Sequence, residues 1–121
     1  MAMILFVDDD ELLHPLVGKV LQDAGHNLVF AADGERACAL AREQPFDLIL
    51  LDYEMPKMTG IDVLNHLKMM RTGPPPVIML TARGDAETVQ ACIRAGARDF
   101  IVKPFNVEEL LRRVTQHLGE G

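Results

Sequence analysis

Short apolar runs alternate along the chain with segments of helical periodicity. The runs are Met3 to Val7, Leu28 to Ala31, Leu48 to Leu51, Val77 to Leu80 and Phe100 to Val102. The first, third and fourth runs are almost continuously apolar, which is typical of central strands in a parallel sheet that is covered on both faces. The pattern therefore predicts five strands.

The segments between the runs carry apolar residues at helical spacing. From Leu12 to Leu21 they recur at i, i+1, i+4 and i+5, with Gly25 expected just beyond the helix as its C′ residue. Pro15 falls in the first or second turn, which leaves the start of this helix open. Four further helices are expected around residues 37–41, 61–68, 89–93 and 107–118. Alternating strands and helices with right-handed crossovers predict a doubly wound α/β fold, although the pattern does not give the strand order.

Length and composition add few constraints. With 121 residues, of which 49% are hydrophobic and 25% charged, we expect one globular domain over residues 1–121. The apolar runs are too short to span a membrane and no signal peptide opens the chain, so we expect a cytoplasmic protein with Cys38 and Cys92 as reduced thiols. The net charge of −6, with Lys and Arg dispersed, argues against nucleic-acid binding by this domain.

Candidate chemistry lies at the ends of the predicted strands. The first strand leads into Asp8 and Asp9, the third into Asp52, the fourth into Thr81 and the fifth into Lys103. In open α/β sheets ligands bind outside the carboxyl ends of the strands. We therefore expect three carboxylates, a hydroxyl and an ammonium group to converge at one edge of the sheet.

Each of these groups has a role in phosphoryl transfer. Crowded carboxylates must either take up protons or bind a cation, and oxygen ligands of this kind suit Mg²⁺. An aspartate can act as the nucleophile and form an acyl phosphate. A lysine and a hydroxyl can neutralise and hydrogen-bond the phosphoryl oxygens. A single Asp after a strand is more often a turn or capping residue, as we expect for Asp10, but compatible groups at four strand ends favour the functional interpretation.

The same segments resemble response-regulator receiver domains. Residues 4–11 (ILFVDDDE) are similar to the opening strand and acidic pair of that family, and residues 50–60 (LLDYEMPKMTG) to its acceptor loop. Residues 79–83 (MLTAR) resemble the switch-hydroxyl segment, and residues 99–105 (DFIVKPF) the closing lysine–proline motif. The resemblance implies a flavodoxin-like (βα)5 fold with a five-stranded parallel sheet in the order 2-1-3-4-5.

The resemblance also implies a function. Asp52 would accept a phosphoryl group from a histidine kinase or a histidine phosphotransfer protein. Mg²⁺, or Mn²⁺ in its place, would bind Asp8, Asp9, Asp52 and the backbone carbonyl of Glu54. Such a domain is a signalling switch; its only chemistry is self-phosphorylation from a donor and self-dephosphorylation.

Further expectations concern the response to phosphorylation. Lys103 would pair with the phosphoryl group, and the bond before Pro104 is a candidate for the cis form. Thr81 would move toward the phosphoryl group while Phe100 turns inward, changing a face made of the fourth helix, fifth strand and fifth helix. Many members carry Tyr at the position of Phe100, so the lack of a hydroxyl favours the inward rotamer here; an ordinary core Phe is the alternative.

Two residues near the site are candidates for setting the lifetime of the acyl phosphate. Glu54 lies two positions after Asp52, and Arg83 two positions after Thr81. We expect an Arg–Glu pair across the mouth of the site that screens the phosphoryl group, with two unrelated solvated side chains as the alternative.

Two other functions deserve comparison. A phosphatase of the haloacid dehalogenase type would have Asp at the position of Glu54, and a flavodoxin-like electron carrier would have a glycine- and hydroxyl-rich loop in place of Asp8 to Glu11. Within the receiver family, the domain could act alone, as a monomer or a phosphorylation-dependent dimer, or belong to a longer regulator with an output domain.

Overall fold

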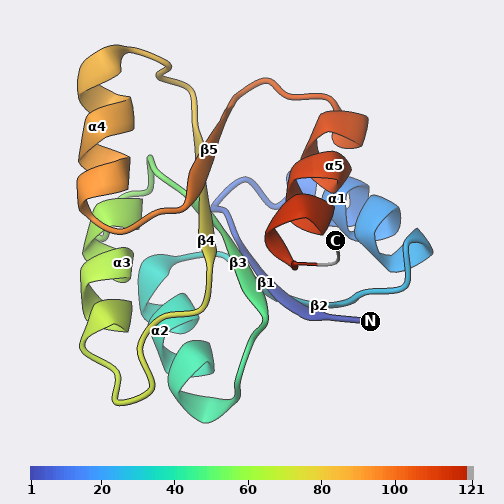
Figure 1. The fold of residues 1–121 in the computed structure, drawn as a ribbon, viewed down its shortest axis with the longest axis horizontal. Helices are drawn as coiled ribbons and strands as arrows, with labels where there is room; N and C mark the ends of the chain where they lie inside the picture. The colour runs from blue at the N-terminus through green and yellow to red at the C-terminus, as the bar shows by residue number, and fades with distance from the viewer. Residues whose placement is uncertain (120–121) are drawn as a thin grey trace.

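The structure, a computed structural model, describes residues 1–119 and consists of alternating strands and helices (Figure 1). The strands are β1 (Met3–Val7), β2 (Asn27–Ala31), β3 (Leu48–Asp52), β4 (Val77–Thr81) and β5 (Asp99–Val102). The helices are α1 (Leu13–Asp23), α2 (Gly34–Glu43), α3 (Gly60–Lys68), α4 (Ala86–Arg94) and α5 (Val107–His117). All strand pairs are parallel and the order is β2-β1-β3-β4-β5, so the expected flavodoxin-like fold is confirmed.

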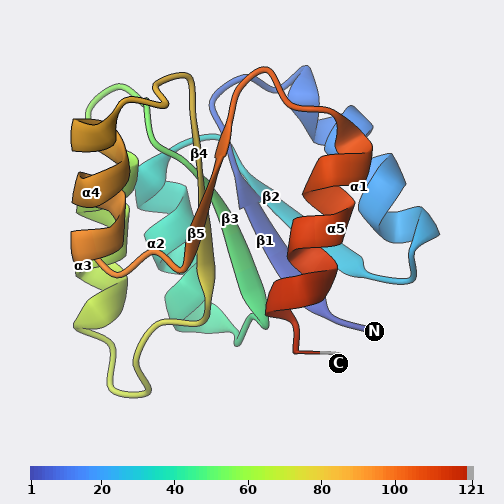
Figure 2. The same ribbon diagram turned by 45° about the horizontal axis from the view of Figure 1, so that its top comes forward.

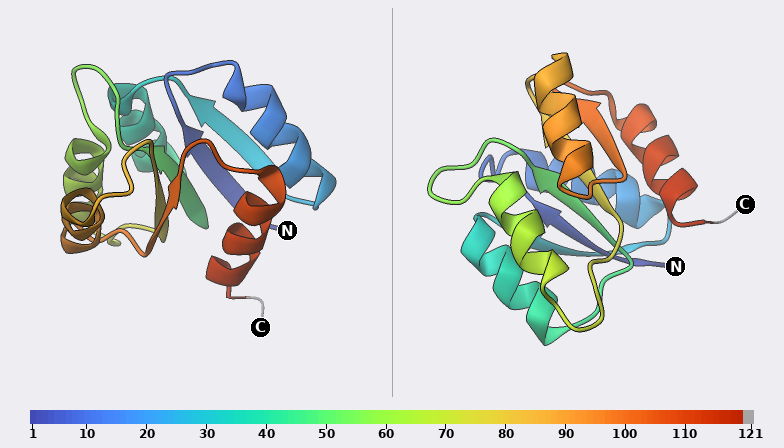
Figure 3. Two further views of the ribbon diagram at one scale, coloured as in Figure 1. Left: turned by 90° about the horizontal axis from the view of Figure 1, so that it is seen from above. Right: turned by 60° about the vertical axis from the view of Figure 1, so that its left-hand side comes forward.

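The sheet lies between two layers of helices (Figures 2 and 3). Helices α2, α3 and α4 cover one face, and α1 and α5 cover the other. Successive strand residues alternate between these layers: Leu51 packs into the core under α2 and α3, while Leu50 packs into the core under α1 and α5. The continuous apolar runs are therefore explained by two cores on opposite faces of one sheet.

Local sequence signals set the helix boundaries. Side-chain oxygens of Asp33, Thr59, Asp85 and Asn106 accept hydrogen bonds from backbone amides in the first turns of α2, α3, α4 and α5. At the other end of α1, Gly25 follows the C-cap with a φ of 97°, as its predicted C′ role requires.

Three apolar residues within or next to the predicted helices are exposed to solvent. Leu12 precedes α1 and is 85% exposed, Leu16 is 53% exposed, and Ile93 on α4 is 57% exposed. The apolar residues of these helices come in adjacent pairs, such as Leu16–Val17 and Cys92–Ile93, and each pair covers a wider arc of the helix surface than the sheet buries. In α1 that stripe centres on the fully buried Val17 and Leu21.

The carboxyl ends of the strands form one edge of the sheet, and both ends of the described chain lie at the opposite edge (Figure 2). Met1 and Leu118 line the same surface hollow there. At the carboxyl edge the chain order reverses between β1 and β3, because β1 pairs with β2 on one side and with β3 on the other. No helix within residues 1–119 has both the length and the apolar character needed to cross a bilayer.

Candidate functional site

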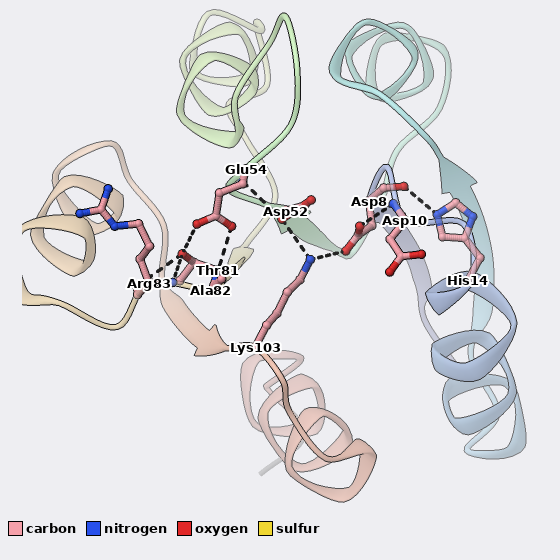
Figure 4. Close-up of polar contacts among 9 residues, drawn as sticks. All are labelled: Asp8, Asp10, His14, Asp52, Glu54, Thr81, Ala82, Arg83 and Lys103. Carbon is pink, nitrogen blue, oxygen red and sulfur yellow. Dashed lines mark hydrogen bonds and ion pairs between the residues drawn. The ribbon is translucent and has the colours of Figure 1, made fainter.

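The carboxyl edge brings together the side chains of Asp8, Asp52, Thr81 and Lys103 (Figure 4). Asp8 directly follows β1 and Lys103 directly follows β5, whereas Asp52 and Thr81 are the last residues of β3 and β4. The strands are thus one residue longer at these two ends than the apolar runs predict. Asp52 and Thr81 are consequently held by the hydrogen bonding of the sheet itself.

Three carboxylates converge at this edge. One side-chain oxygen from each of Asp8, Asp9 and Asp52 lies within 4.8 Å of the others. Asp8 is completely buried and Asp52 is 2% exposed, while Asp9 faces solvent. Because burial penalises the charged form of a carboxyl group, this cluster has a strong tendency to take up a cation or a proton.

The Lys103 ammonium group bridges the two buried carboxylates. Its Nζ lies 2.9 Å from Asp8 Oδ2 and 3.2 Å from Asp52 Oδ1. Burial raises the pKa of the Asp52 carboxyl to about 7, and the charge of Asp8 adds to this rise, while Lys103 acts in the opposite direction. For Lys103, burial alone would lower the pKa, but its hydrogen bonds and attraction to the two carboxylates prevail and the pKa is raised.

The loop after β1 is organised by the acidic residues themselves. Asp8 Oδ1 accepts a hydrogen bond from the Asp10 amide, and Asp10 Oδ1 accepts one from the Leu12 amide, so Asp10 has the turn role predicted for it. His14 Nε2 lies 2.9 Å from the Asp8 carbonyl oxygen. A carbonyl can only accept, so this ring nitrogen carries the hydrogen.

The loop after β3 is fixed by backbone hydrogen bonds close to Asp52. Tyr53 donates its amide to the Leu80 carbonyl, and the Gly60 amide donates to the Tyr53 carbonyl. A Cβ at Gly60 would lie 2.6 Å from the Asp52 carbonyl oxygen, so the close approach of α3 to Asp52 requires glycine. The reciprocal hydrogen bonds of Thr59 and Asp62 begin α3 at this point.

The expected Arg83–Glu54 pair does not form among the residues that the structure describes. The Glu54 carboxylate instead accepts hydrogen bonds from the Thr81 hydroxyl, at 2.9 Å, and from the Ala82 amide, at 3.2 Å. Arg83 Nε lies 3.2 Å from Asp85 Oδ1. The arginine is drawn to the carboxylate that caps α4, because that group lies only two residues away and shares its exposure to solvent.

The sequence contained a signal for the Arg83 contact that was overlooked. Asp85 is followed three residues later by Thr88, and Asp85 accepts hydrogen bonds from both the amide and the hydroxyl of Thr88. These hydrogen bonds lower the pKa of Asp85. The ionised carboxylate of an N-cap Asp at this position can form an ion pair with the nearby Arg83 guanidinium.

Phe100 on β5 is half-buried and packs against the core under α2, α3 and α4. Its carbonyl accepts a hydrogen bond from Arg113, which also binds Asp99, and Asp99 is bound in turn by His117. This network ties β5 to α5 and was not predicted. The Lys103–Pro104 peptide bond that follows β5 is cis.

The donor set fits a hard divalent cation. Two buried carboxylates and one exposed carboxylate supply oxygen ligands at one point, and the exposed side leaves room for the waters that Mg²⁺ retains. The backbone carbonyl of Asp8 already accepts a hydrogen bond from His14, so the side-chain oxygens are the ligands that this loop offers. Lys103 supplies one positive charge against three carboxylates, which leaves negative charge for a cation to neutralise. The residues present thus suit Mg²⁺ or Mn²⁺.

Fold and site together define a class of doubly wound α/β domain with an acidic, cation-binding cluster at the carboxyl ends of its strands, and comparison with known proteins identifies the family. The chain belongs to the response regulator receiver domain family, whose family model matches residues 4–115. Receiver domains are signalling switches of two-component systems rather than classical enzymes. The phosphatase and electron-carrier alternatives therefore have no support.

Particular relatives cover the chain almost completely. It is 45% identical over 114 residues to the transcriptional regulatory protein CpxR of Escherichia coli strain K12, an alignment that covers 94% of this chain and 48% of CpxR. The chain thus spans about half the length of the curated relatives that it matches first. The chemotaxis protein CheY4 of Vibrio cholerae has a similar structure, with a TM-score of 0.90, 38% identity, and coverage of 96% of this chain and 98% of CheY4.

A third similarity bears on the metal. The receiver domain of the sensor histidine kinase PA1611 from Pseudomonas aeruginosa has a TM-score of 0.89 and 29% identity, covering 98% of each chain. Its structure holds a magnesium ion in the active-site cleft.

Proposed function

We propose that this domain is a switch in which Asp52 accepts a phosphoryl group from a histidine kinase or a histidine phosphotransfer protein in the cytoplasm. The observation that carries the proposal is the position of Asp52. It is a buried carboxylate at a strand end, paired with Lys103 and within reach of two further carboxylates. Such a nucleophile can form an acyl phosphate.

The proposed transfer makes and breaks one bond. An ionised oxygen of Asp52 attacks the phosphorus of a phosphohistidine, the new O–P bond forms, and the P–N bond breaks with its electron pair passing to the imidazole nitrogen. The Lys103 ammonium lies against the oxygen atoms of the site and can neutralise charge on the phosphoryl group. The switch is reset by hydrolysis: a water oxygen attacks the phosphorus, the O–P bond to Asp52 breaks and regenerates the carboxylate, and inorganic phosphate leaves as a proton of the water passes to solvent.

Asp8, Asp9 and Asp52, with the backbone carbonyl of Glu54, would hold the Mg²⁺. When bound, the ion supplies positive charge to the phosphoryl oxygens. Binding of the ion would also favour the ionised form of Asp52, whose pKa is raised to about 7. This matters because the carboxyl group must be ionised both to bind a metal and to act as a nucleophile.

The output follows from Thr81 and Phe100. Rearrangement of the Thr81 hydroxyl toward a phosphoryl group would free space beside β5, into which Phe100 can pack further, altering the face formed by α4, β5 and α5. Since CpxR is a transcriptional regulator about twice the length of this chain, a fused or separate output partner is part of the proposal. The receiver would act as a monomer or as a phosphorylation-dependent dimer.

The test is modification by a small phosphodonor. Incubation with acetyl phosphate and Mg²⁺, followed by mass spectrometry, should add one phosphoryl group that maps to Asp52. Asp52→Asn and chelation of the metal should each abolish the addition. Modification that survives either change would overturn the proposal.

A further inference from the structure

Two hydrogen-bond donors beside Asp52 are already occupied. The Thr81 hydroxyl and the Ala82 amide come from consecutive residues at the end of β4, and each binds a different oxygen of the same Glu54 carboxylate (Figure 4). Glu54 itself comes from the loop after β3. A single carboxylate therefore spans the gap between the two strands.

The local geometry directs the Thr81 hydroxyl toward Glu54. Thr81 Oγ1 accepts a hydrogen bond of 2.9 Å from the Arg83 amide, which occupies one lone pair and fixes the oxygen. Its hydrogen can then point to Glu54 Oε2 at 2.9 Å, whereas the alternative acceptor, the Arg83 carbonyl, lies at 3.4 Å. The carboxylate is thus the better acceptor by distance and by charge.

The two donors form a small anion-binding site at the acceptor. β3 and β4 are adjacent with Asp52 opposite Leu80, so Thr81 and Ala82 lie one and two residues beyond the acceptor's partner. Thr81 is completely buried, and its hydroxyl has one hydrogen to give, as has the Ala82 amide. Each donor can therefore serve one anion at a time, either the Glu54 carboxylate or an oxygen of a phosphoryl group on Asp52.

The Glu54 side chain can leave this site while its backbone stays in place. The Glu54 amide donates to Asp52 Oδ1 at 3.3 Å, which anchors the backbone near the acceptor. The residue is exposed to solvent, so a released carboxylate is hydrated at once. Release costs the two hydrogen bonds to a charged acceptor, a cost that water partly offsets.

We propose that the Glu54 carboxylate is an internal competitor of the phosphoryl group for the Thr81 hydroxyl and the Ala82 amide. In the resting domain it occupies both donors and holds Thr81 in place, and it must depart before a phosphoryl oxygen can bind there. The apparent affinity for the phosphoryl group is lowered by the fraction of molecules in which the donors are occupied. This inference rests on the proposed function of Asp52, and it makes Glu54 a positioning residue that sets the threshold of the switch.

The experiment compares Glu54→Ala and Glu54→Gln with the parent domain. The first readout is the amide proton of Ala82 by NMR in the metal-free domain, where loss of the charged acceptor should shift the resonance upfield in both variants. The second is the affinity for beryllofluoride, a phosphoryl analogue, at saturating Mg²⁺. Tyr53 is the sole tyrosine in a chain without tryptophan, so its fluorescence reports binding next to the acceptor.

The control is Glu11→Gln, which removes one exposed negative charge from the acidic loop after β1. We expect Glu54→Ala to bind beryllofluoride roughly tenfold more tightly than the parent, the equivalent of one hydrogen bond to a charged group. Glu11→Gln should stay within about twofold of the parent, as expected for an exposed charge.

The outcomes separate the two proposals. Equal affinity of the parent and Glu54→Ala, or an equal gain in Glu11→Gln, would overturn the competition while leaving Asp52 as the acceptor. An unchanged Ala82 resonance in both Glu54 variants would also overturn it. Failure of the parent and of every variant to bind beryllofluoride, together with no modification by acetyl phosphate, would overturn the proposed function and this inference with it.

Discussion

Lys103 Nζ lies 2.9 Å from Asp8 Oδ2, although 95 positions separate the two residues in the chain. The ion pair links the end of the first strand to the end of the last, across β3 and β4. Since the same ammonium group also binds Asp52, one cation compensates two buried carboxylates. The electrostatics of the metal-free site therefore depend on this single side chain.

Removal of that cation should destabilise the metal-free domain. For Lys103→Met we expect the free energy of unfolding to fall by roughly 3 kcal/mol at about pH 8, because two buried carboxylates lose their partner. Urea unfolding measures the change. Lys19→Met serves as a control, since its ion pair with Asp23 is exposed and should contribute less than about 0.5 kcal/mol. Equal effects of the two substitutions would contradict the assigned role of Lys103.

The Asp52 carboxylate should oppose folding when no metal is bound. Asp52→Asn removes a buried charge from a crowded cluster. We therefore expect the free energy of unfolding of the metal-free domain to rise by about 1–2 kcal/mol. The proposed Mg²⁺ site exists only in the native state, so Mg²⁺ should stabilise the parent, whereas the variant lacks one of the proposed ligands and should gain less. Thermal unfolding with and without Mg²⁺ tests this, with Asp23→Asn as an exposed control. Equal Mg²⁺-induced shifts in the parent and Asp52→Asn would refute the expectation.

The pH dependence of metal-free stability should carry the signature of Asp52. Its pKa is about 7 in the folded state and 3.8 for an unperturbed group. Between these pH values the folded state holds one more proton than the unfolded state. The contribution of Asp52 to the free energy of unfolding therefore falls as the pH rises from about 4 to about 7. The slope is at most about 1.4 kcal/mol per pH unit. Unfolding curves across this range should show the slope in the parent, and its persistence in Asp52→Asn would assign it to another group.

The close approach of α3 to Asp52 provides a steric test. In Gly60→Ala the new Cβ would lie 2.6 Å from the Asp52 carbonyl oxygen and 2.8 Å from Met79 Sδ. We expect the free energy of unfolding to fall by about 1–3 kcal/mol and the loop after β3 to be displaced. At Gly84 the nearest atom is Val102 Cγ2 at 3.2 Å, on an exposed side chain that can move, so Gly84→Ala should be nearly neutral. Denaturant unfolding compares the two variants, and a neutral Gly60→Ala would be inconsistent with the described packing.

The sequence predicted the parts of the site that depend on the main chain. Asp8, Asp52, Thr81 and Lys103 could be found because parallel strands place their carboxyl ends at one edge. The partner of Glu54 could not be found in this way, because its side chain reaches from one loop to the next strand. Which acceptor or donor it meets depends on the rotamer and on the spacing of β3 and β4, neither of which leaves a pattern in the sequence. The exposure of Leu16 was missed for a related reason, since apolar doublets do not specify which member a helix turns inward.

The placement of Met1 and Leu118 at the edge opposite the acidic cluster has a practical consequence. Met1 and Leu118 border one hollow, so a short peptide could join them, and circular permutants could be opened at a loop of choice. For the same reason, the domain could be immobilised on a sensor surface through either end with its carboxyl edge facing the solution. Donor proteins could then be captured in the orientation that the proposed phosphotransfer requires.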